Sequence, residues 1–82
     1  SDASIAHISA SPELAVFAAA TDADTITPGV ATRLNEAVSG SLHPASTIKI
    51  YSGAEHGLPM FAQNAELEPM LMGWLLNALD QE

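Results

Sequence analysis

Residues 13 to 20, ELAVFAAA, form a nearly unbroken apolar run directly after Pro12. Eight residues is a usual strand length, and Val16 and Phe17 favour β structure, although the alanines also permit a helix. A strand that is apolar on both faces is typical of the middle of a parallel sheet whose faces are covered by helices. The run therefore predicts a buried strand of an α/β fold.

Three further segments follow this strand. Residues 29 to 39 carry an apolar stripe and end before Gly40, which predicts a helix. Residues 46 to 52 alternate between apolar and polar side chains, as in a half-buried strand. Residues 68 to 79, EPMLMGWLLNAL, predict a terminal helix. The order strand, helix, strand indicates two parallel strands joined by a crossover.

The same segments supply the predicted core. Alternation places Ile48 and Ile50 on one face of the second strand, and helical spacing gathers the large side chains of the terminal helix. The side chains expected to be largely buried are Val16, Phe17, Leu34, Ile48, Ile50, Leu71, Trp74 and Leu75.

Residues with acid–base chemistry follow both strands. Asp22 and Asp24 come after the first strand and His56 after the second, and parallel strands bring both loops to the edge where open α/β sheets hold their sites. An aspartate there would accept a hydrogen bond from one imidazole nitrogen and leave the other nitrogen free as a base. Gly53 and Gly57 would let the histidine loop turn sharply. A surface histidine in a glycine-rich turn is the alternative that the spacing leaves open.

The rest of the sequence offers little other chemistry. His7 lies in the N-terminal lead-in and His43 in a loop before Pro44, so we expect both to be solvated. No histidine pair has the i,i+4 spacing of helical metal ligands, and the absence of cysteine excludes thiolate metal sites, so we expect no metal and no cofactor. There is no G-x-S-x-G nucleophile elbow, no G-x-G-x-x-G and no phosphate-binding loop.

The composition limits the classes of partner. Two basic residues, Arg33 and Lys49, stand against ten acidic ones, and the net charge of −8 argues against nucleic acids and anionic membrane surfaces. The 82 residues suffice for at most one small domain, and a hydrophobic content of 48% is high for that length. Either the core is dense, or some apolar surface faces further polypeptide. No apolar run reaches the ~18 residues of a membrane span. The first ten residues do not have the pattern of a secretion signal, which favours the cytoplasm. The compartment stays open, because the N-terminus of the parent protein can lie upstream of these residues.

The residues around His56 resemble a known family. IKIYSGAEHGLPMF is similar to the last strand and histidine loop of α/β-hydrolases, especially the esterase and dienelactone-hydrolase-like branches. In those proteins the strand ends in Gly-Ala-x-His-Gly, and the histidine is the catalytic base. LAVFAAATDADTITPG is similar to the preceding acid strand, in which a proline follows the aspartate by four residues, as Pro28 follows Asp24. The resemblance covers roughly residues 12 to 79 and implies that Asp24, rather than Asp22, is the triad acid.

The chain departs from that family in one large respect. An α/β-hydrolase has a sheet of about eight strands, with the nucleophile elbow upstream and the triad in the order Ser, Asp, His. This sequence matches the last two members and lacks the nucleophile and the oxyanion hole. The resemblance thus implies that residues 1–82 are the C-terminal part of one hydrolase domain, inactive alone.

The resemblance also implies partners and a reaction. The partner would be the remainder of the domain or another copy of the chain. The reaction would be carboxylesterase-like hydrolysis of a small ester. The alternative is a non-enzymatic α/β interaction module whose aspartate and histidine are incidental.

Overall fold

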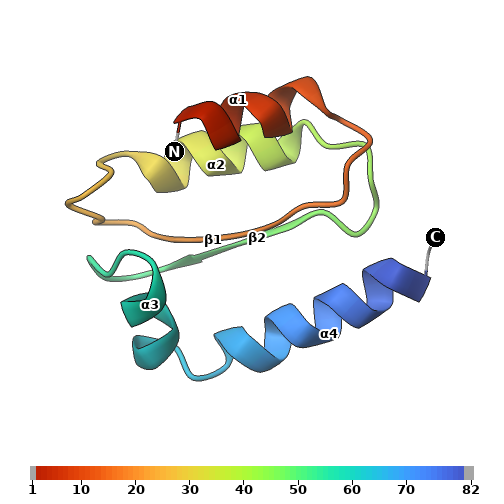
Figure 1. Cartoon of the computed structure of the whole chain (residues 1–82). Helices are drawn as coiled ribbons and strands as arrows, with labels where there is room; N and C mark the ends of the chain where they lie inside the picture. The colour runs from red at the N-terminus through yellow and green to blue at the C-terminus, as the bar shows by residue number, and fades with distance from the viewer. Residues whose placement is uncertain (1, 81–82) are drawn as a thin grey trace.

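The computed structural model describes residues 2–80, without the side chain of Asp2. Two strands lie between two helical layers, with α1 and α2 on one face and α3 and α4 on the other (Figure 1). The elements, in chain order, are α1 (Asp2–Ala10), β1 (Phe17–Thr21), α2 (Val30–Ser39), β2 (Thr47–Tyr51), α3 (Leu58–Gln63) and α4 (Leu67–Asp80).

The strands β1 and β2 are parallel, as the strand–helix–strand order predicts. Their register runs from Phe17 opposite Thr47 to Thr21 opposite Tyr51, with α2 between them in the chain. The arrangement is a small α/β fold, and both strands run toward the same end of the sheet, on the left in Figure 1.

The first strand begins later than its apolar run predicts. The structure places β1 at Phe17–Thr21, not at residues 13 to 20. The backbone N–H of Leu14 donates to the carbonyl of Ser11 in a turn, and the N–H of Val16 donates to the side chain of Ser46. Residues 13 to 16 therefore lie before the start of the partner strand, so hydrophobicity alone marks the wrong boundary.

The core lies mainly between the sheet and the two helices above it. One buried cluster joins Val16, Ala18 and Val38, and a second joins Ala20, Val30 and Ala31. Helix α1, which the sequence did not predict, contributes Ile8 to the first cluster and Ile5 to the second. The helix packs on the same side of the sheet as α2 (Figure 1).

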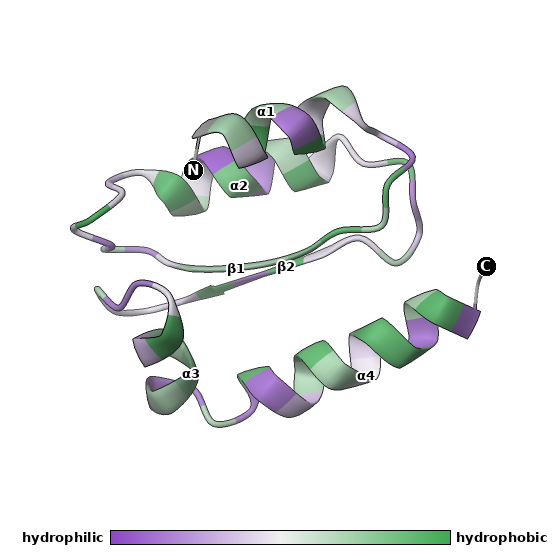
Figure 2. Ribbon diagram, viewed as in Figure 1, coloured by the Kyte–Doolittle hydropathy of each residue, from purple (hydrophilic) through white to green (hydrophobic). Residues whose placement is uncertain are grey.

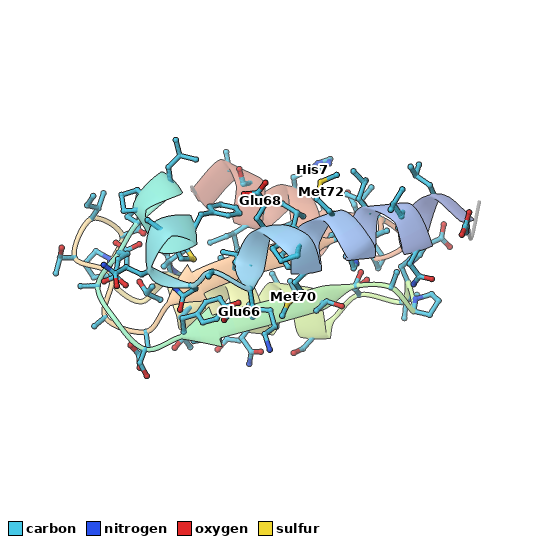
Figure 3. The ribbon with its side chains drawn as sticks, turned by 90° about the horizontal axis from the view of Figure 1, so that it is seen from below. His7, Glu66, Glu68, Met70 and Met72 are labelled. Carbon is cyan, nitrogen blue, oxygen red and sulfur yellow. The ribbon has the colours of Figure 1, made fainter. Side chains whose placement is uncertain are left out.

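The lower layer is held to the sheet by a smaller set of contacts. The rings of Phe17 and Trp74 lie 5.7 Å apart between centroids and are tilted by 58°. The indole N–H of Trp74 donates to the carbonyl oxygen of Ala45. Leu67, at the start of α4, is fully buried. Figure 3 looks onto this side, with α4 in front of the strands.

The predicted core is only partly correct. Val16 is buried, whereas Phe17, Leu34, Ile48, Leu71 and Trp74 are half-buried. Ile50 and Leu75 are 44% and 42% exposed, because the neighbouring elements do not reach over them. The alternation of β2 and the helical spacing of α4 therefore predicted too wide a buried face on each element.

Helix α4 is apolar on more than the side that meets the sheet (Figure 2). Its exposed apolar side chains follow the i, i+3, i+4, i+7 spacing of a single helical stripe; they are Met72, Leu75, Leu76 and Leu79. Among residues 2–80, no helix combines the length and the apolar character needed to cross a bilayer.

Candidate functional site

The loops that follow β1 and β2 are joined to each other beyond the sheet. The N–H of Asp22 donates to the carbonyl of Tyr51 at 2.9 Å, and the N–H of Ala23 donates to that of Gly53 at 2.8 Å. The Asp22 carboxylate in turn accepts the N–H of Gly53 at 3.0 Å. These bonds hold the aspartate loop and the histidine loop at the carboxyl edge of the sheet, where the sequence predicts a site.

Asp24 and His56 meet at this edge. Nδ1 of His56 lies 2.6 Å from Oδ2 of Asp24, which is 6% exposed. An ionised carboxylate only accepts hydrogen bonds, so Nδ1 of a neutral His56 carries the proton and donates it. The side chain of His56 is 42% exposed. The pairing leaves Nε2 of the neutral ring as an acceptor, the state required of a general base.

The second oxygen of the Asp24 carboxylate is bound by its own loop. Oδ1 accepts the backbone N–H groups of Ile26 and Thr27, both at 2.8 Å. The N–H of Thr27 is the largest cause that lowers the Asp24 pKa to about 2, and desolvation opposes it. The hydrogen bonds from His56 and from the Ile26 N–H lower the pKa further. Asp24 is therefore ionised across the neutral pH range, as an acceptor for the imidazole must be.

Thr27 is a site residue that the sequence analysis did not identify. Its hydroxyl oxygen lies 3.4 Å from Nδ1 of His56, in addition to its backbone contact with Asp24. A signal was present, because an aspartate side chain in a turn commonly accepts a hydrogen bond from the backbone N–H two residues further along the chain. The sequence DTIT therefore indicates both an anchored carboxylate and a hydroxyl near it.

The glycines beside His56 are required by the backbone. Gly53 has φ 139° and Gly57 has φ 68°, a region that residues with a Cβ rarely adopt. A Cβ at Gly53 would also lie 2.6 Å from Oε1 of Glu55. Gly57 precedes α3, and Pro59 occupies its first turn. The sharp turns expected from the sequence are present.

A cavity of about 490 Å³ extends from the Asp24–His56 pair along β1. Its polar end is formed by Asp24, Thr27 and His56, and its walls are apolar; they include Phe17, Ala19, Leu34, Phe61 and Leu71. The wall residues come from β1, α2, α3 and α4, so the cavity lies between the two helical layers. Within residues 2–80, β1 pairs only with β2, so the cavity follows the open edge of the sheet.

The other two histidines do not join the pair. His7 is exposed, as expected, and lies on α1, a helix that the sequence did not predict. His43 is half-buried rather than solvated, and its Nδ1 accepts the N–H of Ala45 at 3.1 Å in a local turn. Within residues 2–80, no three histidine, aspartate or glutamate side chains are grouped so that they could hold a metal ion.

Comparison with known proteins gives no relative. No protein-family model, curated protein or solved structure matches this chain. The functional argument therefore depends on the residues of the site and their geometry.

Proposed function

We propose that this chain is the C-terminal part of a serine hydrolase of the α/β-hydrolase type, in which Asp24 is the acid and His56 the base of a catalytic triad. The observation that supports this most strongly is the 2.6 Å contact between Oδ2 of Asp24 and Nδ1 of His56, at the carboxyl edge of two parallel strands. The order of acid and histidine in the chain is that of the α/β-hydrolase triad.

In this proposal His56 transfers a proton twice in each half-reaction. Its Nε2 takes the proton of a serine hydroxyl while the serine oxygen attacks the ester carbonyl, and the imidazolium returns the proton to the departing alcohol. In the second half-reaction His56 takes a proton from water while the water oxygen attacks the acyl-enzyme. The imidazolium then returns the proton to the serine oxygen as the acid leaves. Asp24 stays ionised throughout, which fits its lowered pKa, and stabilises the positive charge that His56 carries between the steps.

The open edge of β1 supports the remainder of a hydrolase domain as the partner. The N–H of Asp22 and the carbonyl of Val16 bond to β2, so the intervening backbone groups of Phe17, Ala19 and Thr21 point away from it. A further parallel strand beside β1 would fill much of the apolar cavity and end at the same edge as the Asp24–His56 pair.

A second copy of the chain fits the site less well. Pairing of β1 with β1 of another copy about a two-fold axis is antiparallel. The loops that follow the partner's strands would then lie at the opposite edge from His56. The parallel strand of a larger domain is the arrangement that delivers a nucleophile to this site, so we prefer it to self-association.

The test is an esterase assay on the protein encoded by the full reading frame that contains this chain, with an aryl ester as substrate. His56→Ala should lower kcat by a factor on the order of 10⁴, and Asp24→Asn should also lower it strongly. His7→Ala is the matched control, because His7 is exposed on α1, and it should leave kcat unchanged. Activity within threefold of wild type in both site variants would refute the proposal and favour a non-enzymatic interaction module.

A further inference from the structure

The side chain of Thr21 forms a link between the two loops that the function proposed above does not use. Thr21 is the last residue of β1 and is 1% exposed. Its hydroxyl donates to the backbone carbonyl of Glu55 at 2.7 Å. Glu55 immediately precedes His56, and Thr21 lies three residues before Asp24. One buried hydroxyl therefore ties the end of the acid strand to the residue next to the histidine.

The histidine needs such a link because packing does not hold it. The His56 side chain is 42% exposed, and the loop around it contains two glycines with positive φ, at positions 53 and 57. Glycine has more backbone freedom to lose than other residues, so a glycine-rich loop is ordered only where hydrogen bonds fix it. The position of the imidazole consequently depends on the hydrogen bonds of its loop.

Asp24 and Thr27 contact the ring of His56, whereas the other contacts that hold the backbone of this loop act further from it. The N–H of Ala23 and the carboxylate of Asp22 both bind Gly53, which precedes His56 by three residues. Between Gly53 and His56, the hydroxyl of Thr21 is the contact that reaches across from the acid strand, at Glu55. It is therefore the anchor best placed to set the direction in which the imidazole leaves the backbone.

We infer that Thr21 is a positioning residue, whose hydroxyl holds the histidine loop so that Nδ1 of His56 faces Asp24. This inference gives Thr21 a part in catalysis only if the proposed function is correct. The hydroxyl itself is essential here, because valine has nearly the same shape but would leave the Glu55 carbonyl without its donor. Serine would retain the donor and lose only a methyl group.

The test measures the tautomer of His56 by NMR, with ¹⁵N-labelled histidine, in the protein encoded by the full reading frame that contains this chain. In a buffer about two pH units above the pKa of free imidazole, the ring nitrogens of wild-type His56 should report the Nδ1–H form, because Nδ1 lies beside Oδ2 of Asp24. In Thr21→Val the ratio of Nδ1–H to Nε2–H forms should fall by about 2- to 10-fold, the factor expected for loss of one net hydrogen bond. Thr21→Ser should restore the wild-type ratio.

Two controls separate this role from general stability. Thr25→Val changes an exposed threonine of the same loop and should leave the His56 ratio unchanged. The ring signals of His7 should not change in any variant, because His7 lies on α1. Circular dichroism establishes that each variant is folded.

Three results would refute the inference. A Thr21→Val chain that is folded and keeps the wild-type ratio would refute it. A Thr21→Ser chain that loses the Nδ1–H form would also refute it, and this result is decisive even if Thr21→Val does not fold. A wild-type His56 without the Nδ1–H form would instead refute the Asp24–His56 pairing, and with it both the proposed function and this inference.

Discussion

Trp74 makes both the ring contact and the hydrogen bond that join the middle of α4 to the sheet side of the molecule, so we predict that Trp74→Ala lowers the free energy of unfolding by about 2–3 kcal/mol. A fully buried tryptophan is worth about 3–5 kcal/mol in such a truncation. Trp74 is half-buried, which reduces its apolar contribution to about 2 kcal/mol, and its hydrogen bond to Ala45 adds about 1 kcal/mol. The better helix propensity of alanine returns about 0.5 kcal/mol.

The measurement is urea unfolding followed by circular dichroism, because Trp74 is the chain's single tryptophan and its fluorescence is lost in the variant. Trp74→Phe is a milder variant that keeps a ring beside Phe17 and removes the indole donor, and it should cost about 1 kcal/mol. Leu76→Ala on the exposed stripe of α4 is the control and should change stability by about 0.5 kcal/mol or less. A loss below about 1 kcal/mol in Trp74→Ala would show that α4 is not held by this contact.

Further predictions concern the site loops and the exposed side of α4. The Asp24 pKa is lowered from 3.8 to about 2, so ionised Asp24 stabilises the fold fully above pH 3.8, and this contribution is lost as the pH falls through about 2. The free energy of unfolding of wild type should therefore fall with pH over this range more steeply than that of Asp24→Asn, and an equal slope in the two proteins would contradict the assignment. Gly57→Ala should lower the free energy of unfolding by about 1–2 kcal/mol, because residue 57 has a φ of 68°. A Cβ there meets nothing within 4 Å, so the cost comes from the backbone, and an unchanged stability in urea unfolding would contradict this. Gly73→Ala in the middle of α4 should stabilise by about 0.5–1 kcal/mol, since its Cβ also meets nothing within 4 Å, and destabilisation would indicate a contact on that face.

The sequence predicted the fold class because its apolar pattern changes between the strand and helix periods. The alternation of residues 46 to 52 and the stripe of residues 29 to 39 each identified an element within one or two residues of its observed bounds. Helix α1 was missed because DASIAHISA has only two large apolar residues, Ile5 and Ile8. These meet the core only after the chain has folded back onto α2.

The sequence likewise predicted only part of the candidate site. Parallel strands alone place Asp22, Asp24 and His56 at one edge, but they do not distinguish between the two aspartates. The resemblance to α/β-hydrolases selected Asp24, and the structure pairs Asp24 with His56 while Asp22 binds the backbone of Gly53. The contact of Thr21 with Glu55 had no sequence signal, because a threonine at the end of a strand is common for its β-branched shape alone.

The central claim is that His56 is a base whose serine nucleophile lies outside these 82 residues. The most direct measurement is labelling of the full-length protein with a fluorophosphonate, which reacts with activated serines, followed by mass spectrometry of the modified peptide. The account predicts one labelled serine, in a G-x-S-x-G sequence upstream of this chain, and labelling that is slowed by at least about 100-fold in His56→Ala. Absence of a labelled serine, or equally fast labelling without His56, would contradict it.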